Sequence, residues 1–121
     1  MSERGGLGRR GEGWAADFLE KRGYRILGRN IRLRIGEIDL VAEQDGCTVL
    51  VEVKTYRPGF MEPEEAVGRN KQLRIAALGA SYLKSKGKPD AEWRADVVAI
   101  EVGADGAPSR IEHYVNAIEE W

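Results

Sequence analysis

Residues 36–54 read GEIDLVAEQDGCTVLVEVK, two alternating apolar runs on either side of an Asp-Gly pair. Alternating apolar residues predict strands, and Asp-Gly between two such runs is the strongest short-range signal for a β-hairpin. We therefore predict strands over residues 35–43 and 48–54, joined by a tight turn at Asp45-Gly46.

The register of this hairpin brings carboxylates together. Counting back from a two-residue turn places Asp39 opposite Glu52 and Glu37 opposite Lys54. Opposed side chains have Cβ atoms roughly 4.5–5.5 Å apart, and two carboxylates at that distance require a raised pKa or a cation. A divalent cation with oxygen ligands, most simply Mg²⁺, satisfies both acids. The alternative is a solvated surface ladder, in which Glu37 and Lys54 form an ion pair and the other two acids face water.

The periodicity of the remaining chain predicts an α/β fold of order α-β-β-β-α-β-β. Beyond the hairpin we predict helices over residues 8–22 and 63–84. We predict strands over residues 24–34, 93–102 and 110–115. The second helix is a crossover connection, so the strands before and after it are expected to be parallel neighbours. The strand with Glu52 and Lys54 is then interior, where two charged side chains on one face are unusual. This favours the metal site over the surface ladder.

A third carboxylate lies on the first predicted helix. Glu12 falls one turn before Ala16, beside the apolar stripe of this helix, a position from which it can point over the sheet. An acidic residue near a helix start is also favoured by the helix dipole alone. On the residues alone, the second interpretation is the favoured one.

The composition limits the classes of function. The chain has 121 residues, of which 42% are hydrophobic, and we predict a flexible segment at 1–7 followed by a single domain at 8–121. One cysteine and one histidine, Cys47 and His113, exclude an internal disulfide and a Cys- or His-rich metal site. No apolar run is long enough to cross a membrane, and the first residues do not read as a signal peptide. We expect a cytoplasmic protein.

The net charge of −1 conceals a gradient along the chain. Residues 1–34 carry nine basic and four acidic side chains, residues 35–88 carry eight of each, and residues 89–121 carry two basic and eight acidic. A uniformly basic nucleic-acid wrapper is excluded, but a polyanion would approach the first third of the chain.

Several stretches together are similar to a known family. GEIDLVA and VEVKT resemble the PD-(D/E)XK nuclease superfamily, and the whole chain after its first seven residues resembles the small bacterial YraN family. The further matching stretches are GRRGEGWAADFLEKRGYRIL, RN at 29–30, NKQLRI and RADVVAI. The resemblance implies a restriction-endonuclease-like core, with a central mixed β-sheet flanked by helices, like that of archaeal Holliday-junction resolvases. The YraN family itself is functionally uncharacterised.

The resemblance also implies roles for individual residues. Asp39 matches the motif aspartate, Glu52 the second metal-binding acid and Lys54 the motif lysine. The Val53 carbonyl is an expected extra ligand of Mg²⁺ or Mn²⁺, and Glu12 resembles the first-helix acid of the resolvase-like branch. Supporting positions are Gln72 and Glu37, and the expected nucleic-acid contacts are Arg9, Arg10, Arg29, Arg32, Arg34 and Arg57.

Three functional hypotheses remain. The first is a metal-dependent nuclease that hydrolyses phosphodiester bonds in DNA, with branched or structured DNA as its expected substrate. The second is a nucleic-acid-binding module that has the nuclease-like fold but little cleavage activity. The third is a protein-interaction scaffold that docks through the acidic last third and Trp121. A homodimer is expected from the resemblance, because small nucleases of this class often cut two strands symmetrically.

Overall fold

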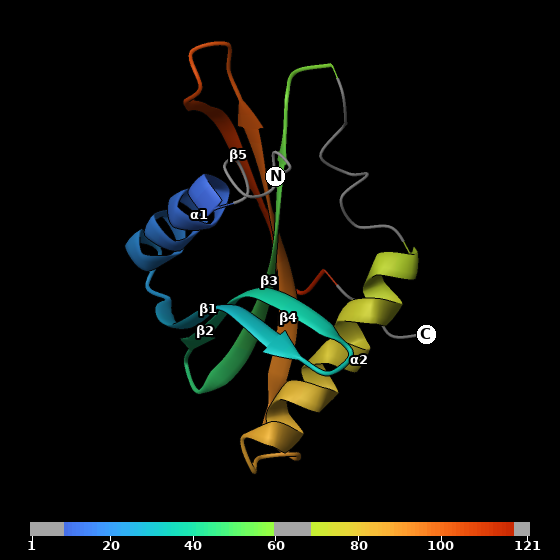
Figure 1. The fold of residues 1–121 in the computed structure, drawn as a ribbon. Coiled ribbons are helices and arrows are strands. Elements are labelled where there is room, and N and C mark those ends of the chain that lie inside the picture. The colour runs from blue at the N-terminus through green and yellow to red at the C-terminus, as the bar shows by residue number, and fades with distance from the viewer. Residues whose placement is uncertain (1–8, 60–68, 118–121) are drawn as a thin grey trace.

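The computed structural model describes residues 9–59 and 69–117 (Figure 1). These residues form two helices and five strands in the predicted order α-β-β-β-α-β-β. The elements are α1 (Arg9–Lys21), β1 (Arg25–Leu33), β2 (Gly36–Gln44), β3 (Cys47–Tyr56), α2 (Arg69–Ser85), β4 (Trp93–Val102) and β5 (Pro108–Tyr114). The flexible segment predicted at 1–7, the helix start predicted at 63 and the docking role of Trp121 lie outside the described residues.

The five strands form one mixed sheet of order β1-β2-β3-β4-β5. The pairs β1–β2, β2–β3 and β4–β5 are antiparallel, whereas β3 and β4 are parallel because α2 connects them as a crossover. The predicted interior position of β3 is therefore confirmed. The last strand begins at Pro108, two residues before its predicted start.

The predicted Asp-Gly hairpin is confirmed. Asp45 and Gly46 have φ angles of 52° and 80°, the left-handed conformations that a two-residue type I′ turn requires. The resulting register pairs Gln44 with Cys47 and continues to Leu40 opposite Val51. The tight turn thus sets which side chains of β2 and β3 meet.

The two helices cover opposite faces of the sheet, which gives three layers (Figure 1). Ala15, Ala16 and Leu19 of α1 pack in one core with Val51 and Val53 of β3. The second core joins apolar residues of α2 to the other face of the sheet, among them Ile75, Leu78, Leu83, Ile38 and Leu50. Neither helix in the described part of the chain has the length and apolar character that a membrane crossing requires.

Candidate active site

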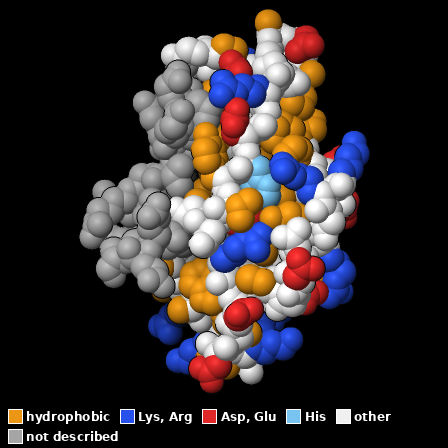
Figure 2. Space-filling model, turned by 180° about the vertical axis from the view of Figure 1, so that it is seen from behind, with side chains coloured by type: hydrophobic (Ala, Val, Ile, Leu, Met, Phe, Trp, Pro, Cys, Tyr) orange, Lys and Arg blue, Asp and Glu red, His pale blue; other side chains and the backbone are white. Residues whose placement is uncertain are grey.

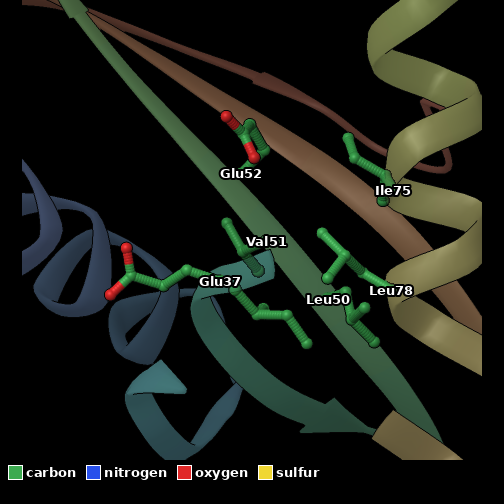
Figure 3. Close-up of a pocket in the computed structure, with 7 residues that line it drawn as sticks. Glu37, Leu50, Val51, Glu52, Ile75 and Leu78 are labelled. Atoms are coloured by element: carbon green, nitrogen blue, oxygen red, sulfur yellow. The ribbon is translucent and has the colours of Figure 1, made fainter. Parts of the chain in front are cut away.

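Glu52 and Lys54 lie on the central strand β3. Val51 and Val53 belong to the core beneath α1, so Glu52 between them faces the side of α2. There Glu52 is half-buried and lines a small pocket together with Leu50 and Ile75 (Figure 3). Glu52 is an acidic side chain on a mostly apolar interior strand, and Lys54 lies two residues later on the same face. These two side chains form the centre of the candidate site.

The Asp39 carboxylate is fixed to the backbone of the same strand. Only 3% of Asp39 is exposed, and the Val53 backbone N–H donates a hydrogen bond of 2.9 Å to its Oδ2 atom. The described β2–β3 ladder runs from Gln44–Cys47 to Leu40–Val51, one pair short of Asp39. Asp39 therefore bonds β3 through its side chain at the point where the backbone ladder stops.

The strand alternation changes at this position. Leu40 belongs to the core on the α1 side, whereas Ile38, two residues away, belongs to the core on the α2 side. In a regular strand these two side chains would share one face. The break lies at Asp39, and it lets the Asp39 carboxylate reach the β3 backbone next to Glu52.

The oxygen atoms at this break suit a hard cation. Since the N–H and C=O of one strand residue point toward the same neighbouring strand, the Val53 carbonyl is directed into the same gap as Asp39. Carboxylates of Asp39 and Glu52 with one backbone carbonyl are the ligand types that Mg²⁺ and Mn²⁺ prefer. Within the described residues, no group of three or more His, Cys, Asp or Glu side chains is arranged to hold a metal ion. The fit therefore rests on two carboxylates and a carbonyl.

Glu12 of α1 is buried, at 8% exposure, as expected if it points over the sheet. Its Oε1 atom accepts a hydrogen bond of 2.8 Å from Asn30 Nδ2 on β1. The pairs Arg29–Leu40 and Ile31–Ile38 flank Asn30, which places it opposite Asp39. Glu12 is thus linked through Asn30 to the strand position that neighbours Asp39.

Asn30 was not predicted as a site residue. Its φ angle of 51° is left-handed, a conformation that asparagine tolerates better than most residues. The Arg-Asn pair at 29–30 was a recognised part of the family-like pattern, and it is the signal that points to this position. The spacing of residues alone could not point to Asn30, because its hydrogen bond to Glu12 joins β1 to α1 across the turn between them.

The start of α1 approaches β3 closely because residue 11 is glycine. A Cβ atom on Gly11 would lie 2.4 Å from Thr55 Cγ2 and 3.6 Å from Val53 Cγ1. Only a residue without a side chain lets the helix sit at this distance. The contact places Glu12 on the α1 side of the end of β3, above Val53 and Thr55 and on the face opposite to Glu52 and Lys54.

The other predicted site residues are less closely grouped. Glu37 also lines the pocket, but its carboxylate is directed away from Glu52 (Figure 3), and its Oε2 atom lies 3.7 Å from Arg32 Nε. The exposed arginines come from α1, from β1 and the turn after it, and from the end of β3: Arg10, Arg29, Arg32, Arg34 and Arg57. The side chains of Arg9 and Gln72 lie outside the described set.

A second polar cluster, centred on Asp96 of β4, was not predicted. Asp96 has no exposed surface. Its Oδ1 atom accepts hydrogen bonds from Arg94 Nε at 3.0 Å and the Asn116 backbone N–H at 2.9 Å. Its Oδ2 atom accepts one from Tyr24 Oη at 3.2 Å and lies 2.8 Å from His113 Nε2. This cluster, the Asp96 cluster below, ties β4 to the segment between α1 and β1, to β5 and to the segment after β5.

The pKa of Asp96 predicts a pH dependence of stability. Burial alone would raise this pKa, but hydrogen bonds from His113, Arg94 and the Asn116 backbone outweigh burial and hold the pKa below its ordinary value of 3.8. A carboxyl group with a lowered folded-state pKa stabilises the fold above its unfolded pKa, and the contribution is lost as the pH falls through the folded pKa. The free-energy difference between wild type and Asp96→Asn is therefore expected to be constant above about pH 5 and to shrink below about pH 4.

Urea unfolding of both proteins at pH 7, 5, 4 and 3 measures this difference. Asp90→Asn, at an exposed position, is the matched control and should change stability little at any pH. A difference between wild type and Asp96→Asn that stays the same from pH 7 to pH 3 would contradict the assignment.

The family model described as "Uncharacterised protein family UPF0102" matches residues 11–100, which include Glu12, Asn30, Asp39, Glu52 and Lys54. The chain belongs to UPF0102. A UPF0102 protein of Symbiobacterium thermophilum is 49% identical over 107 residues, covering 88% of this chain and 89% of the relative. A UPF0102 protein of Geobacter sulfurreducens is 46% identical over 114 residues, covering 93% and 88%. The resemblance to the YraN family inferred from the sequence is thus confirmed.

Proposed function

We propose that this UPF0102 protein is a metal-dependent nuclease that hydrolyses phosphodiester bonds in DNA, with branched or structured DNA as its substrate. The observation that carries the proposal is the hydrogen bond from the Val53 backbone to Asp39, which holds one carboxylate beside Glu52 and Lys54. The proposal includes Mg²⁺ or Mn²⁺ as the cofactor, a homodimer as the assembly and the cytoplasm as the compartment. The single cysteine, Cys47, supports the last, because the chain does not depend on an internal disulfide that an oxidising compartment would form.

Each residue of the candidate site has a role in this reaction. Asp39, Glu52 and the Val53 carbonyl would hold the metal ion. Such an ion, when bound, acts as a Lewis acid toward the phosphate and lowers the pKa of bound water. Lys54, on the same face of β3 as Glu52, orients the attacking water or stabilises the negative charge that develops on the phosphate. Glu12 lies on the opposite, α1, face of the sheet, and its role would be to hold Asn30 at the position that neighbours Asp39.

Phosphate binding would come from the arginine-rich first third of the chain. Arg29, Arg32 and Arg34 are exposed on the β1–β2 hairpin, the hairpin that also carries Asp39. The face of the molecule in Figure 2 instead mixes basic, acidic and apolar side chains, without a uniformly basic area. Affinity for DNA is therefore expected to come from a limited set of phosphate contacts and to fall with salt.

The second candidate function is a binding module with little or no cleavage. One observation favours it: the described His, Cys, Asp and Glu side chains do not form a metal-holding group of three or more. A site with two carboxylates and a carbonyl would bind the ion more weakly than a site with three or more such side chains. In that case the same arginines would bind structured DNA without hydrolysing it.

Cleavage assays on the purified full chain test the proposal. A labelled four-way junction, a matched duplex and a single strand are incubated with Mg²⁺, Mn²⁺ or EDTA. We expect metal-dependent cleavage, which the Lys54→Met variant lowers by at least about 100-fold, because this change keeps the side-chain length but removes the charge. Lys84→Met, at an exposed lysine near the end of α2, is the control and should stay within about twofold of wild type.

The remaining outcomes separate the two functions. Junction binding without cleavage in either metal would replace the nuclease by the binding module. Cleavage that Lys54→Met leaves unchanged would indicate a contaminating nuclease or another site. A protein that neither binds nor cleaves any of the three DNAs would contradict both functions.

A further inference from the structure

The turn between β1 and β2 exposes an isoleucine. Ile35 is 56% exposed, and it follows a strand in which Ile31 and Leu33 are half-buried and Leu27 is 45% exposed. Ile31 and Leu33 pack against the core on the α2 side. An exposed aliphatic side chain by itself is ordinary on a protein surface. The surroundings of Ile35 set it apart.

The turn that carries Ile35 is short and supported. Leu33 pairs with Gly36, so only Arg34 and Ile35 lie between the two strands. A Cβ atom on Gly36 would lie 3.2 Å from Leu78 Cδ2, which means that α2 packs directly beneath the turn. Leu33 and Leu78 both belong to the packing on the α2 side, so the turn is supported from that side while Ile35 stays exposed.

Positive charge flanks the exposed side chain. The Arg32 side chain is 87% exposed, and Arg34 and Arg29 are exposed as well. An apolar side chain between cations is the combination with which proteins enter a DNA base stack: the cations bind phosphates, and the apolar group inserts between neighbouring bases.

The distance from Ile35 to the candidate site matches DNA. Ile35 precedes Asp39 by four residues, and residues 36–39 all lie on β2. At 3.2–3.4 Å per strand residue this separation is about 13 Å, or roughly four base-pair steps of 3.4 Å along one strand. A base stack opened at Ile35 would thus have a phosphate of the same strand within reach of Asp39 and Lys54.

We infer that Ile35 is a wedge that inserts into the base stack where it is already interrupted, at the branch point of a junction or flap. The inference rests on the proposed function and extends it: it assigns the preference for branched DNA to a single side chain. Unstacking costs least where pairing is already disturbed. A wedge with this energetics selects a branch point over continuous duplex, while the arginines bind both.

The test measures DNA binding in EDTA, so it does not depend on cleavage. Wild type, Ile35→Ser, Ile35→Leu and Val115→Ser are titrated against a four-way junction with 2-aminopurine at the branch point and against a duplex of the same sequence. Val115 is the matched control because it is also 56% exposed but follows β5, on the opposite edge of the sheet. We expect Ile35→Ser to lower the preference for the junction about tenfold and to abolish the rise in 2-aminopurine fluorescence. Ile35→Leu and Val115→Ser should behave like wild type.

Other results would overturn the wedge. Equal losses for junction and duplex would make Ile35 a general contact. Unchanged binding would remove it from the DNA interface, and a change from dimer to monomer in sedimentation without a change in junction preference would place it between two copies of the chain. Metal-dependent cleavage that survives in Ile35→Ser with its junction preference intact would leave the nuclease standing and remove the wedge. A junction preference and a rise in 2-aminopurine fluorescence that depend on Ile35, in a protein that does not cleave, would support the wedge and contradict the nuclease.

Discussion

The Asp96→Ala variant is expected to lose about 3–5 kcal/mol of its free energy of unfolding. Asp96 is completely buried, and four groups direct hydrogen bonds or a ring nitrogen at its two oxygen atoms. Removing the carboxylate leaves the Arg94 guanidinium, whose side chain is only 21% exposed, without its buried counter-charge. A domain of this size has roughly 5–15 kcal/mol of stability in total, so the variant should be close to unfolding.

Urea denaturation followed by circular dichroism measures this loss. Asp90→Ala, an exposed aspartate in the loop before β4, is the control and should lie within about 0.5 kcal/mol of wild type. Asp96→Asn should fall between the two, because the amide keeps one acceptor oxygen but loses the negative charge. A loss for Asp96→Ala below about 1 kcal/mol would mean that the Asp96 cluster is no more than a set of ordinary hydrogen bonds.

The Asp96 cluster joins segments that are far apart in the sequence. Tyr24 lies 72 residues from Asp96 and His113 lies 17 residues from it. The cluster fixes the segment between α1 and β1, and the segment after β5, to strand β4. It lies beneath α1 and contributes no residue to the candidate site, so its variants should change stability first. Any effect on cleavage is expected to follow from unfolding.

The sequence predicted those features of the fold that depend on local chemistry. The Asp45-Gly46 turn sets the β2–β3 register because both residues accept a left-handed backbone. The crossover through α2 makes β3 and β4 parallel because two parallel strands need a long connection. These rules act over a few residues or over one chain connection. They are therefore visible without any knowledge of the remaining chain.

The candidate site was only partly predictable. Extending the hairpin register beyond Leu40 assumes an unbroken ladder, and it places Asp39 opposite the Glu52 side chain. The structure instead ends the described ladder at Leu40 and lets the Asp39 carboxylate accept the Val53 N–H. In this bond a carboxylate takes the place of a backbone carbonyl. The bond does not alter the alternation of apolar residues in the sequence, so that alternation could not predict it. The same holds for Asn30, whose bond to Glu12 depends on how α1 packs against β1.

The Asp39→Asn variant is expected to lose at least about 100-fold in metal-dependent cleavage while keeping nearly all of its stability. An asparagine side chain has the same shape, and its oxygen still accepts the hydrogen bond from the Val53 N–H. What it loses is the negative charge that would hold a divalent cation. Cleavage of the four-way junction in Mg²⁺, together with thermal unfolding of the same preparation, measures both quantities.

Asp39→Ala and Glu43→Gln complete the series. Alanine also removes the acceptor and leaves a buried N–H without a partner, so its free energy of unfolding should fall by about 1–3 kcal/mol below that of Asp39→Asn. Glu43 lies on the same strand and forms an ion pair with the exposed Arg25, and Glu43→Gln should leave cleavage unchanged. If Asp39→Asn cleaves like wild type but Asp39→Ala is unstable, Asp39 serves only to end the β2–β3 ladder. The carboxylate would then be a structural substitute for a backbone carbonyl, and a metal-dependent reaction at this position would have to be abandoned.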